Sequence, residues 1–99
     1  MIADLYLVLV HGVHIKNVNI IDQGGAIKSL IKQNQSLNPG LTIARVAWPR
    51  GVRDTPKLFS SLTVFLRTPK QANQVITRGF TEEGEVKYIE RFHTGYSLV

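Results

Sequence analysis

The spacing of hydrophobic and polar positions changes along the chain, and each change marks an expected element. Residues 5–10 form a continuous β-prone apolar run that ends at His11-Gly12, as is typical of a buried central strand. Residues 41–48 and 59–66 alternate with the two-residue period of half-buried strands. A fourth strand is expected over residues 85–92.

Two other segments have the three- and four-residue apolar spacing of helices. In the first, Asp22 offers an N-cap for a helix that is expected to run through about Leu37. The second begins at Thr68-Pro69, where a threonine cap, a proline at the first helical position and Gln71 three residues after the cap form a capping box. This helix is expected to end near Gly79, because glycine suits a left-handed C-cap.

The resulting order is strand, helix, strand, strand, helix, strand. It predicts an α+β domain of ferredoxin-like, RRM-like βαββαβ type, with a four-stranded antiparallel sheet and two helices on one face. The apolar positions predict a single core that consists of Ile27, Leu30, Ile31, Val46, Leu62, Val64, Ala72, Val75 and Ile76. Trp48 is expected in this core rather than as a stacking platform.

The other face of the sheet is expected to be open. From the alternation along the strands, the residues expected on it are Leu7, Leu9, Ile43, Arg45, Ser61, Thr63, Phe65 and Ile89. An exposed apolar patch of this kind on a small domain marks an interface. We therefore expect the function to lie on this face.

Length and composition are those of one folded domain, residues 1–99, with 43% apolar residues. Cysteine is absent, which excludes disulfides, thiolate nucleophiles and cysteine-ligated zinc. The apolar run near the start is too short for a signal peptide or a membrane span. The expected protein is soluble, cytoplasmic and/or nuclear, with no membrane partner, cofactor or small-molecule substrate.

The formal net charge of +5 is concentrated in the middle of the chain. Residues 45–70 hold Asp54 as their one acid, and their bases are Arg45, Arg50, Arg53, Lys57, Arg67 and Lys70. Such a segment attracts polyanions, because each neutralised phosphate releases condensed counterions. A solvated basic loop explains the charge equally well when the charge is considered alone.

Residues 62–72, LTVFLRTPKQA, resemble the segment of the RNA-recognition-motif family in which the third strand leads into the second helix. Residues 8–13, VLVHGV, stand where the first-strand motif of that family would lie. A narrower resemblance covers almost the whole chain, and it is to the Gag-like first-open-reading-frame protein of fungal LINE retrotransposons of the Tad group. It depends on several blocks in one order: VLVHGV, then NPGL, IARVAWPR and EGEVK.

This narrower resemblance implies a nucleic-acid-binding domain that precedes CCHC zinc knuckles and belongs to a longer protein. RNA is favoured over DNA as the partner, although the sequence leaves that choice open. The chain departs from the RNA-recognition pattern, which stacks bases on aromatic residues of the two central strands, because the corresponding positions are Leu9, Ser61 and Thr63. We therefore expect mostly phosphate contacts with weak sequence selectivity. The residues expected to make them are Arg45, Arg50, Arg53, Lys57 and Arg67.

An enzymatic alternative comes from residues 10–16, VHGVHIK, which look like the phosphate loop of acylphosphatases. That loop needs an arginine where this chain has Lys16, whose ammonium does not reproduce a guanidinium fork. The expected asparagine of the second strand is also absent, and no nucleophile–base pair is recognisable in the sequence. The histidines lack an accompanying carboxylate, which makes them poor candidates for metal ligands. We therefore expect no catalysis and no metal.

A further alternative is a protein-interaction or self-association module that uses the open face. Apolar residues on that face would serve a second copy of the chain as well as they would serve RNA. The sequence leaves these two interpretations open.

Overall fold

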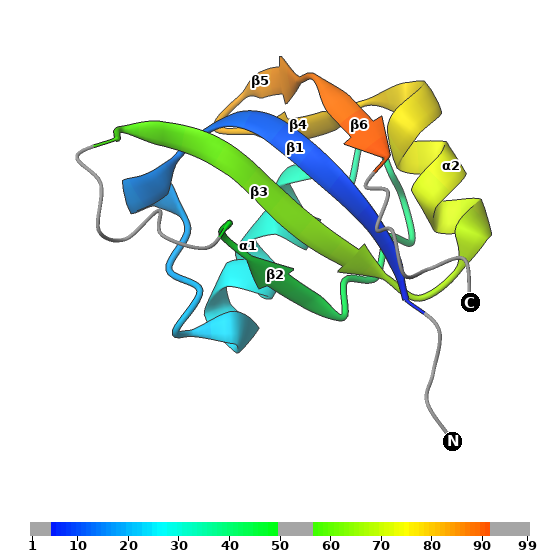
Figure 1. Ribbon diagram of the computed structural model, residues 1–99. Helices are drawn as coiled ribbons and strands as arrows, with labels where there is room; N and C mark the ends of the chain where they lie inside the picture. The colour runs from blue at the N-terminus through cyan, green and yellow to red at the C-terminus, as the bar shows by residue number, and fades with distance from the viewer. Residues whose placement is uncertain (1–4, 50–56, 92–99) are drawn as a thin grey trace, which may run out of the picture.

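The computed structural model describes residues 5–49 and 57–91. Within these residues it contains strands, two α-helices and a short 3-10 helix, η1 (Figure 1). In chain order the elements are β1 (Tyr6–His14), η1 (Ile15–Asn17), α1 (Gln23–Gln33), β2 (Arg45–Ala47), β3 (Phe59–Leu66), α2 (Pro69–Arg78), β4 (Phe80–Glu82), β5 (Glu85–Lys87) and β6 (Ile89–Arg91).

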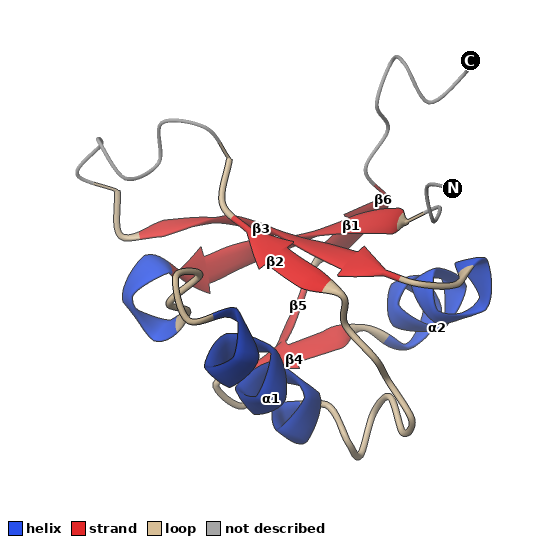
Figure 2. Ribbon diagram, turned by 90° about the horizontal axis from the view of Figure 1, so that it is seen from below, coloured by secondary structure: helices blue, strands red, loops and turns tan. Residues whose placement is uncertain are grey.

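The larger sheet has the strand order β2-β3-β1-β6, and every neighbouring pair in it is antiparallel. Strands β4 and β5 form a separate antiparallel pair. Figure 2 shows α1 and α2 on the same side of the larger sheet. The predicted α+β class, with a four-stranded antiparallel sheet and two helices, is confirmed for the described residues.

The order of elements along the chain differs from a plain βαββαβ sequence, because a hairpin lies between α2 and the last strand. The expected strand over residues 85–92 is divided, so that β5 pairs with β4 and only β6 pairs with β1. At the hairpin turn Glu83 and Gly84 have φ values of 52° and 78°. Positive φ at both central residues is what a tight two-residue hairpin turn requires.

The core follows from the alternation along β1 and β3. Val8 pairs with Val64 and Val10 with Leu62, and these four side chains are fully buried. Full burial of a valine or leucine side chain contributes roughly 1.5–3 kcal/mol to stability. The predicted core residues all lie in or against this core, with Leu30, Val46, Leu62, Val64, Ala72 and Val75 buried and Ile27, Ile31 and Ile76 partly buried.

Strand β1 is longer than the sequence predicts. The expected end at His11-Gly12 is a local irregularity, because the register with β3 shifts between Val10 and Val13 and the strand then continues to His14. Gly12 has a φ of 76°, which a glycine adopts at a bulge without strain. The glycine therefore bends the strand instead of ending it.

The predicted helix caps are present. Asp22 Oδ1 accepts a hydrogen bond from the Gly25 N–H at 3.1 Å, and Thr68 Oγ1 accepts one from the Gln71 N–H at 3.2 Å. Helix α2 ends at Arg78, and its C-cap Gly79 has a positive φ of 93° as expected, but with a ψ of 175° it is extended rather than left-handed helical. Helix α1 ends four residues before the expected Leu37, because its C-cap residue Asn34 begins a series of turns.

The capping box of α2 is only half formed. The amide of Gln71 turns away from Thr68 and reaches the loop before β2. Its Oε1 accepts from the Thr42 hydroxyl at 2.9 Å, and its Nε2 donates to the Gly40 carbonyl at 3.2 Å. The side chain therefore joins α2 to the chain that enters β2.

Two amide side chains of the α1 region hold the outer strands. Gln23 Nε2 donates to the Val46 carbonyl at 2.8 Å, and Gln23 Oε1 accepts from the Val46 N–H at 3.0 Å. Asn34 does the same for β4, with 2.9 Å to the Thr81 carbonyl and 2.8 Å from the Thr81 N–H. The backbone N–H and carbonyl groups of Val46 and Thr81 thus have hydrogen-bond partners without a further strand beside them.

We predict that Asn34→Ala lowers the free energy of unfolding by about 2–3 kcal/mol, because it leaves the part-buried backbone N–H and carbonyl of Thr81 without their side-chain partner. Urea unfolding of the full chain measures the change. Gln35→Ala is the matched control at the next, exposed position, and its effect should stay within about 0.5 kcal/mol. Equal effects of the two substitutions would show that the Asn34 amide does not hold the hairpin.

Candidate functional site

The side of the larger sheet opposite α1 and α2 is here called the open face (Figure 2). The register places Arg45 beside Phe65, Phe65 beside Leu7, and Leu9 between Thr63 and Glu90. Because side chains alternate between the two faces of a strand, every second residue from these positions lies on the same face. The open face consists of Leu7, Leu9 and His11 of β1, Arg45 and Ala47 of β2, Ser61, Thr63 and Phe65 of β3, and Glu90 of β6.

At one end of the open face a cation lies over an aromatic ring. The Arg45 guanidinium carbon is 5.8 Å from the centre of the Phe65 ring. Arg45 is exposed and Phe65 is half-buried. A guanidinium held in this way keeps its N–H groups available for a bidentate contact with phosphate.

At the other end the side chains of His11 and three neighbours form a connected cluster. The Nδ1 atom of His11 is 2.6 Å from the Ser61 hydroxyl, and its Nε2 atom is 3.0 Å from a carboxylate oxygen of Glu90. The imidazole also stacks on Tyr88, with ring centres 5.4 Å apart and an interplanar angle of 22°. Both ring nitrogens and one ring face are therefore in contact with neighbours.

The sequence did not reveal this cluster, because its members are distant along the chain. His11 and Ser61 are 50 positions apart, and His11 and Glu90 are 79 apart. A serine, a histidine and a carboxylate in contact are also the groups of a nucleophile–base pair. The sequence showed no recognisable pair of this kind, and the fold brings these groups within hydrogen-bond distance. The side chains of His11 and Glu90 are 34% and 56% exposed, so the cluster is open to water.

Two residues expected on the open face lie elsewhere. Ile43 precedes β2, which begins only at Arg45, and it is buried in the core. Ile89 pairs with Val10, which places it on the helix side of the sheet, against the core. The sequence analysis placed Ile89 on the open face because it treated residues 85–92 as one alternating strand, whereas β5 and β6 are separate strands. The others, Leu9, Ser61, Thr63 and Phe65, do lie on the open face.

The basic residues are spread along β3. Arg45 and Arg67 lie toward the end of this strand, whereas Lys57 lies before its start, and all three are exposed. Arg50 and Arg53 fall outside the described residues. Within residues 5–49 and 57–91, none of the three exposed bases forms an ion pair.

The described acids are largely engaged with their own neighbours. Lys87 Nζ lies 3.7 Å from the buried Glu82 carboxylate and 3.2 Å from Glu85. Asn17 Nδ2 also donates to Glu82, at 3.2 Å. Negative charge is thus gathered on the β4–β5 hairpin. The β2–β3 part of the described chain is left positive.

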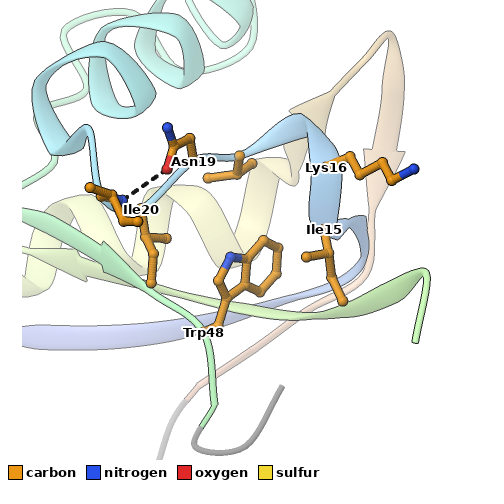
Figure 3. Close-up of a pocket in the computed structure, with 7 residues that line it drawn as sticks. Ile15, Lys16, Asn19, Ile20 and Trp48 are labelled. Carbon is orange, nitrogen blue, oxygen red and sulfur yellow. Dashed lines mark hydrogen bonds between the residues drawn. The ribbon is translucent and has the colours of Figure 1, made fainter. Parts of the chain in front are cut away.

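A shallow pocket of about 260 Å³ lies beside η1, away from the open-face cluster. Figure 3 shows the indole of Trp48 between Ile15 and Ile20, and Lys16 extends away from it. Trp48 packs against the core, as predicted. Of residues 10–16, which resemble a phosphate loop, residues 10–14 continue strand β1 and Ile15 and Lys16 lie in η1.

A search of the described residues for groups of three or more His, Asp or Glu side chains that could hold a metal ion finds none. Among the described helices, none is long and apolar enough to cross a membrane.

We predict a coupling energy of about 0.5–1 kcal/mol between Arg45 and Phe65, as expected for an exposed cation–ring contact. A double-mutant cycle with Arg45→Met, Phe65→Leu and the double variant, followed by urea unfolding, measures it. Arg45→Met with Phe59→Leu is the control, because Phe59 stands at the opposite end of β3. Equal coupling in the two cycles would contradict a specific contact.

Comparison with known proteins gives no relative, because no family model, curated protein or solved structure matches the chain. Any functional assignment therefore depends on the residues and geometry described above.

Proposed function

We propose that the chain is a nucleic-acid-binding domain of ferredoxin-like, RRM-like type that holds single-stranded RNA on the open face. The observation that carries the proposal is the Arg45 guanidinium over Phe65, on a sheet face opposite both helices. The net charge of +5 favours nucleic acid as the ligand of this face. A phosphate backbone is the common intracellular polyanion, and it is attracted to a positively charged protein.

The fold supports this proposal through the strand order of the larger sheet. In β2-β3-β1-β6, the strands that flank α1 lie on either side of β3, and the last strand pairs with β1. A split βαβ arrangement of this type has the helices on one side and an open sheet on the other. In this interpretation the β4–β5 hairpin is an insertion before the final strand of a ferredoxin-like fold.

The distribution of charge supports a contact along β3. Arg45 and Arg67 lie toward one end of this strand and Lys57 lies at the other. Arg50 and Arg53 stand between β2 and β3 in the sequence. These arginines and lysines would meet phosphates, which position a strand of RNA without reading its sequence.

The narrower resemblance, to the Gag-like protein of Tad-type LINE retrotransposons, fits the same function. In that setting the domain would bind RNA in the cytoplasm and/or nucleus, beside zinc knuckles on a longer chain. Weak sequence selectivity suits a protein that coats its RNA, because phosphate contacts are the same at every nucleotide.

Self-association is the second candidate, and one observation favours it. Leu7 and Leu9 lie side by side in β1 on the open face, both partly exposed, next to Phe65. An apolar strip of this kind can pack against a second copy of the chain. The two functions use the same face and are separable by experiment.

We propose that the Ser61–His11–Glu90 cluster performs no turnover. Acyl transfer gains most from preorganised donors in a site that excludes water. The exposure of His11 and Glu90 instead leaves the cluster open to solvent. The hydrogen bonds then serve to orient the imidazole ring.

We predict that Arg45→Gln lowers the slope of log affinity against log salt by about 0.7, because one phosphate contact to a single strand is lost. Affinity should fall by a similar factor on unrelated RNA sequences. Titration of a fluorescent single-stranded RNA at several salt concentrations measures both. Lys28→Gln, exposed on α1 on the helix side, is the control and should change neither.

The double variant Arg50→Ala with Arg53→Ala should lower the same slope by about 1.4, that is, about 0.7 for each arginine. An unchanged slope would show that Arg50 and Arg53 make no phosphate contact. A loss of dimer mass in light scattering, with RNA binding intact, would instead establish the self-association module.

We expect neither acyl phosphate nor nitrophenyl ester to be hydrolysed above background. Colorimetric assays of the wild-type chain beside Ser61→Ala and Lys16→Ala test this. Turnover that one of these substitutions removes would overturn the non-enzymatic assignment.

A further inference from the structure

We propose that Tyr88, held against His11, is a stacking site for one unpaired base of a single-stranded nucleic acid. The site rests on the proposed function and adds a base contact to a face that was expected to make mainly phosphate contacts. It lies at the β1–β6 end of the open face, away from Arg45 and Phe65.

Tyr88 presents an unusual amount of aromatic surface. It is 64% exposed, although one face of its ring stacks on the imidazole of His11. The Tyr88 carbonyl accepts the His11 N–H at 3.0 Å, which fixes the backbone beside β1. A tyrosine that is backed on one side and free elsewhere is the platform on which bases stack, since every base has a π-face.

The ring behind Tyr88 is itself fixed. His11 contacts the Ser61 hydroxyl through Nδ1 and Glu90 through Nε2, so rotation of the imidazole would break both hydrogen bonds. The stacked pair is therefore oriented before any ligand arrives. Preorganisation of this kind reduces the entropy lost on binding.

Charge indicates which part of the nucleic acid would lie here. The Glu90 carboxylate stands beside His11 and would repel a phosphate, whereas an uncharged base is not repelled. Arg45 and Arg67 lie toward the other end of the face, near the end of β3, whereas Lys57 precedes the start of β3. Leu7 and His11 are four residue steps apart along β1, which is about 13 Å in a strand and a distance that a few nucleotides of a single strand can span.

The test uses the full chain and a short single-stranded RNA that carries 2-aminopurine, whose fluorescence is quenched when it stacks on an aromatic ring. Wild type should quench the probe. Tyr88→Ala should abolish the quenching and weaken binding about tenfold, with the salt slope unchanged because no charge is removed. Tyr88→Phe should keep both. Ile21→Ala, an exposed apolar residue beside α1, should also behave as wild type.

Several outcomes would overturn the site. If Tyr88→Ala keeps the affinity and the quenching while Arg45→Gln still lowers the salt slope, the stacking site is wrong and the proposed function stands. If wild type binds no RNA at low salt, both fail. A folded Tyr88→Leu variant with wild-type affinity and quenching would show that bulk, not the ring, is what matters. A fall in solution mass on Tyr88→Ala, with RNA binding intact, would assign the ring to a contact between copies.

Discussion

The antiparallel pairing of β1 with β3 is the constraint on which the rest of the structure depends. Successive side chains of paired strands point to opposite faces, so the register that buries Val8 and Val10 also turns Leu9 outward. A slip of one residue would exchange the two faces entirely. The core beneath the helices and the open face are therefore two consequences of one register.

Side-chain amides, rather than further strands, bind the outer edge of β2 in the larger sheet and of β4 in the separate β4–β5 pair. Gln23 takes both backbone groups of Val46 in β2, and Asn34 takes both of Thr81 in β4. The β4–β5 hairpin held by Asn34 leads directly to Tyr88, which begins the return to β1.

Local signals in the sequence predicted the elements that local interactions determine. The caps at Asp22 and Thr68, the end at Gly79 and the strand over residues 59–66 follow from short-range steric and hydrogen-bonding preferences. The division of the last strand escaped prediction, because β5 pairs with β4 across the Glu83-Gly84 turn while β6 pairs with β1, at the other end of the chain. Failures of this kind are expected where tertiary contacts decide the outcome.

The candidate site was predicted in the same uneven way. The alternation of β3 placed Phe65 correctly, and charge selected Arg45. The cluster of His11 with Ser61 and Tyr88 could not be read from the sequence, because β1, β3 and the β5–β6 junction meet only in the fold. The RNA-recognition pattern concerns aromatic residues of the two central strands only. Tyr88 lies outside those strands, so the sequence underestimated the aromatic surface of the open face.

The most direct test of the account is a titration of the isotope-labelled chain with single-stranded RNA, followed by amide and side-chain chemical shifts. The account predicts shifts at residues of the open face, from Arg45 and Phe65 across to His11 and Tyr88. The exposed lysines of α1, Lys28 and Lys32, should stay unchanged. Shifts confined to α1, or none at low salt, would contradict the claim that the open face binds nucleic acid.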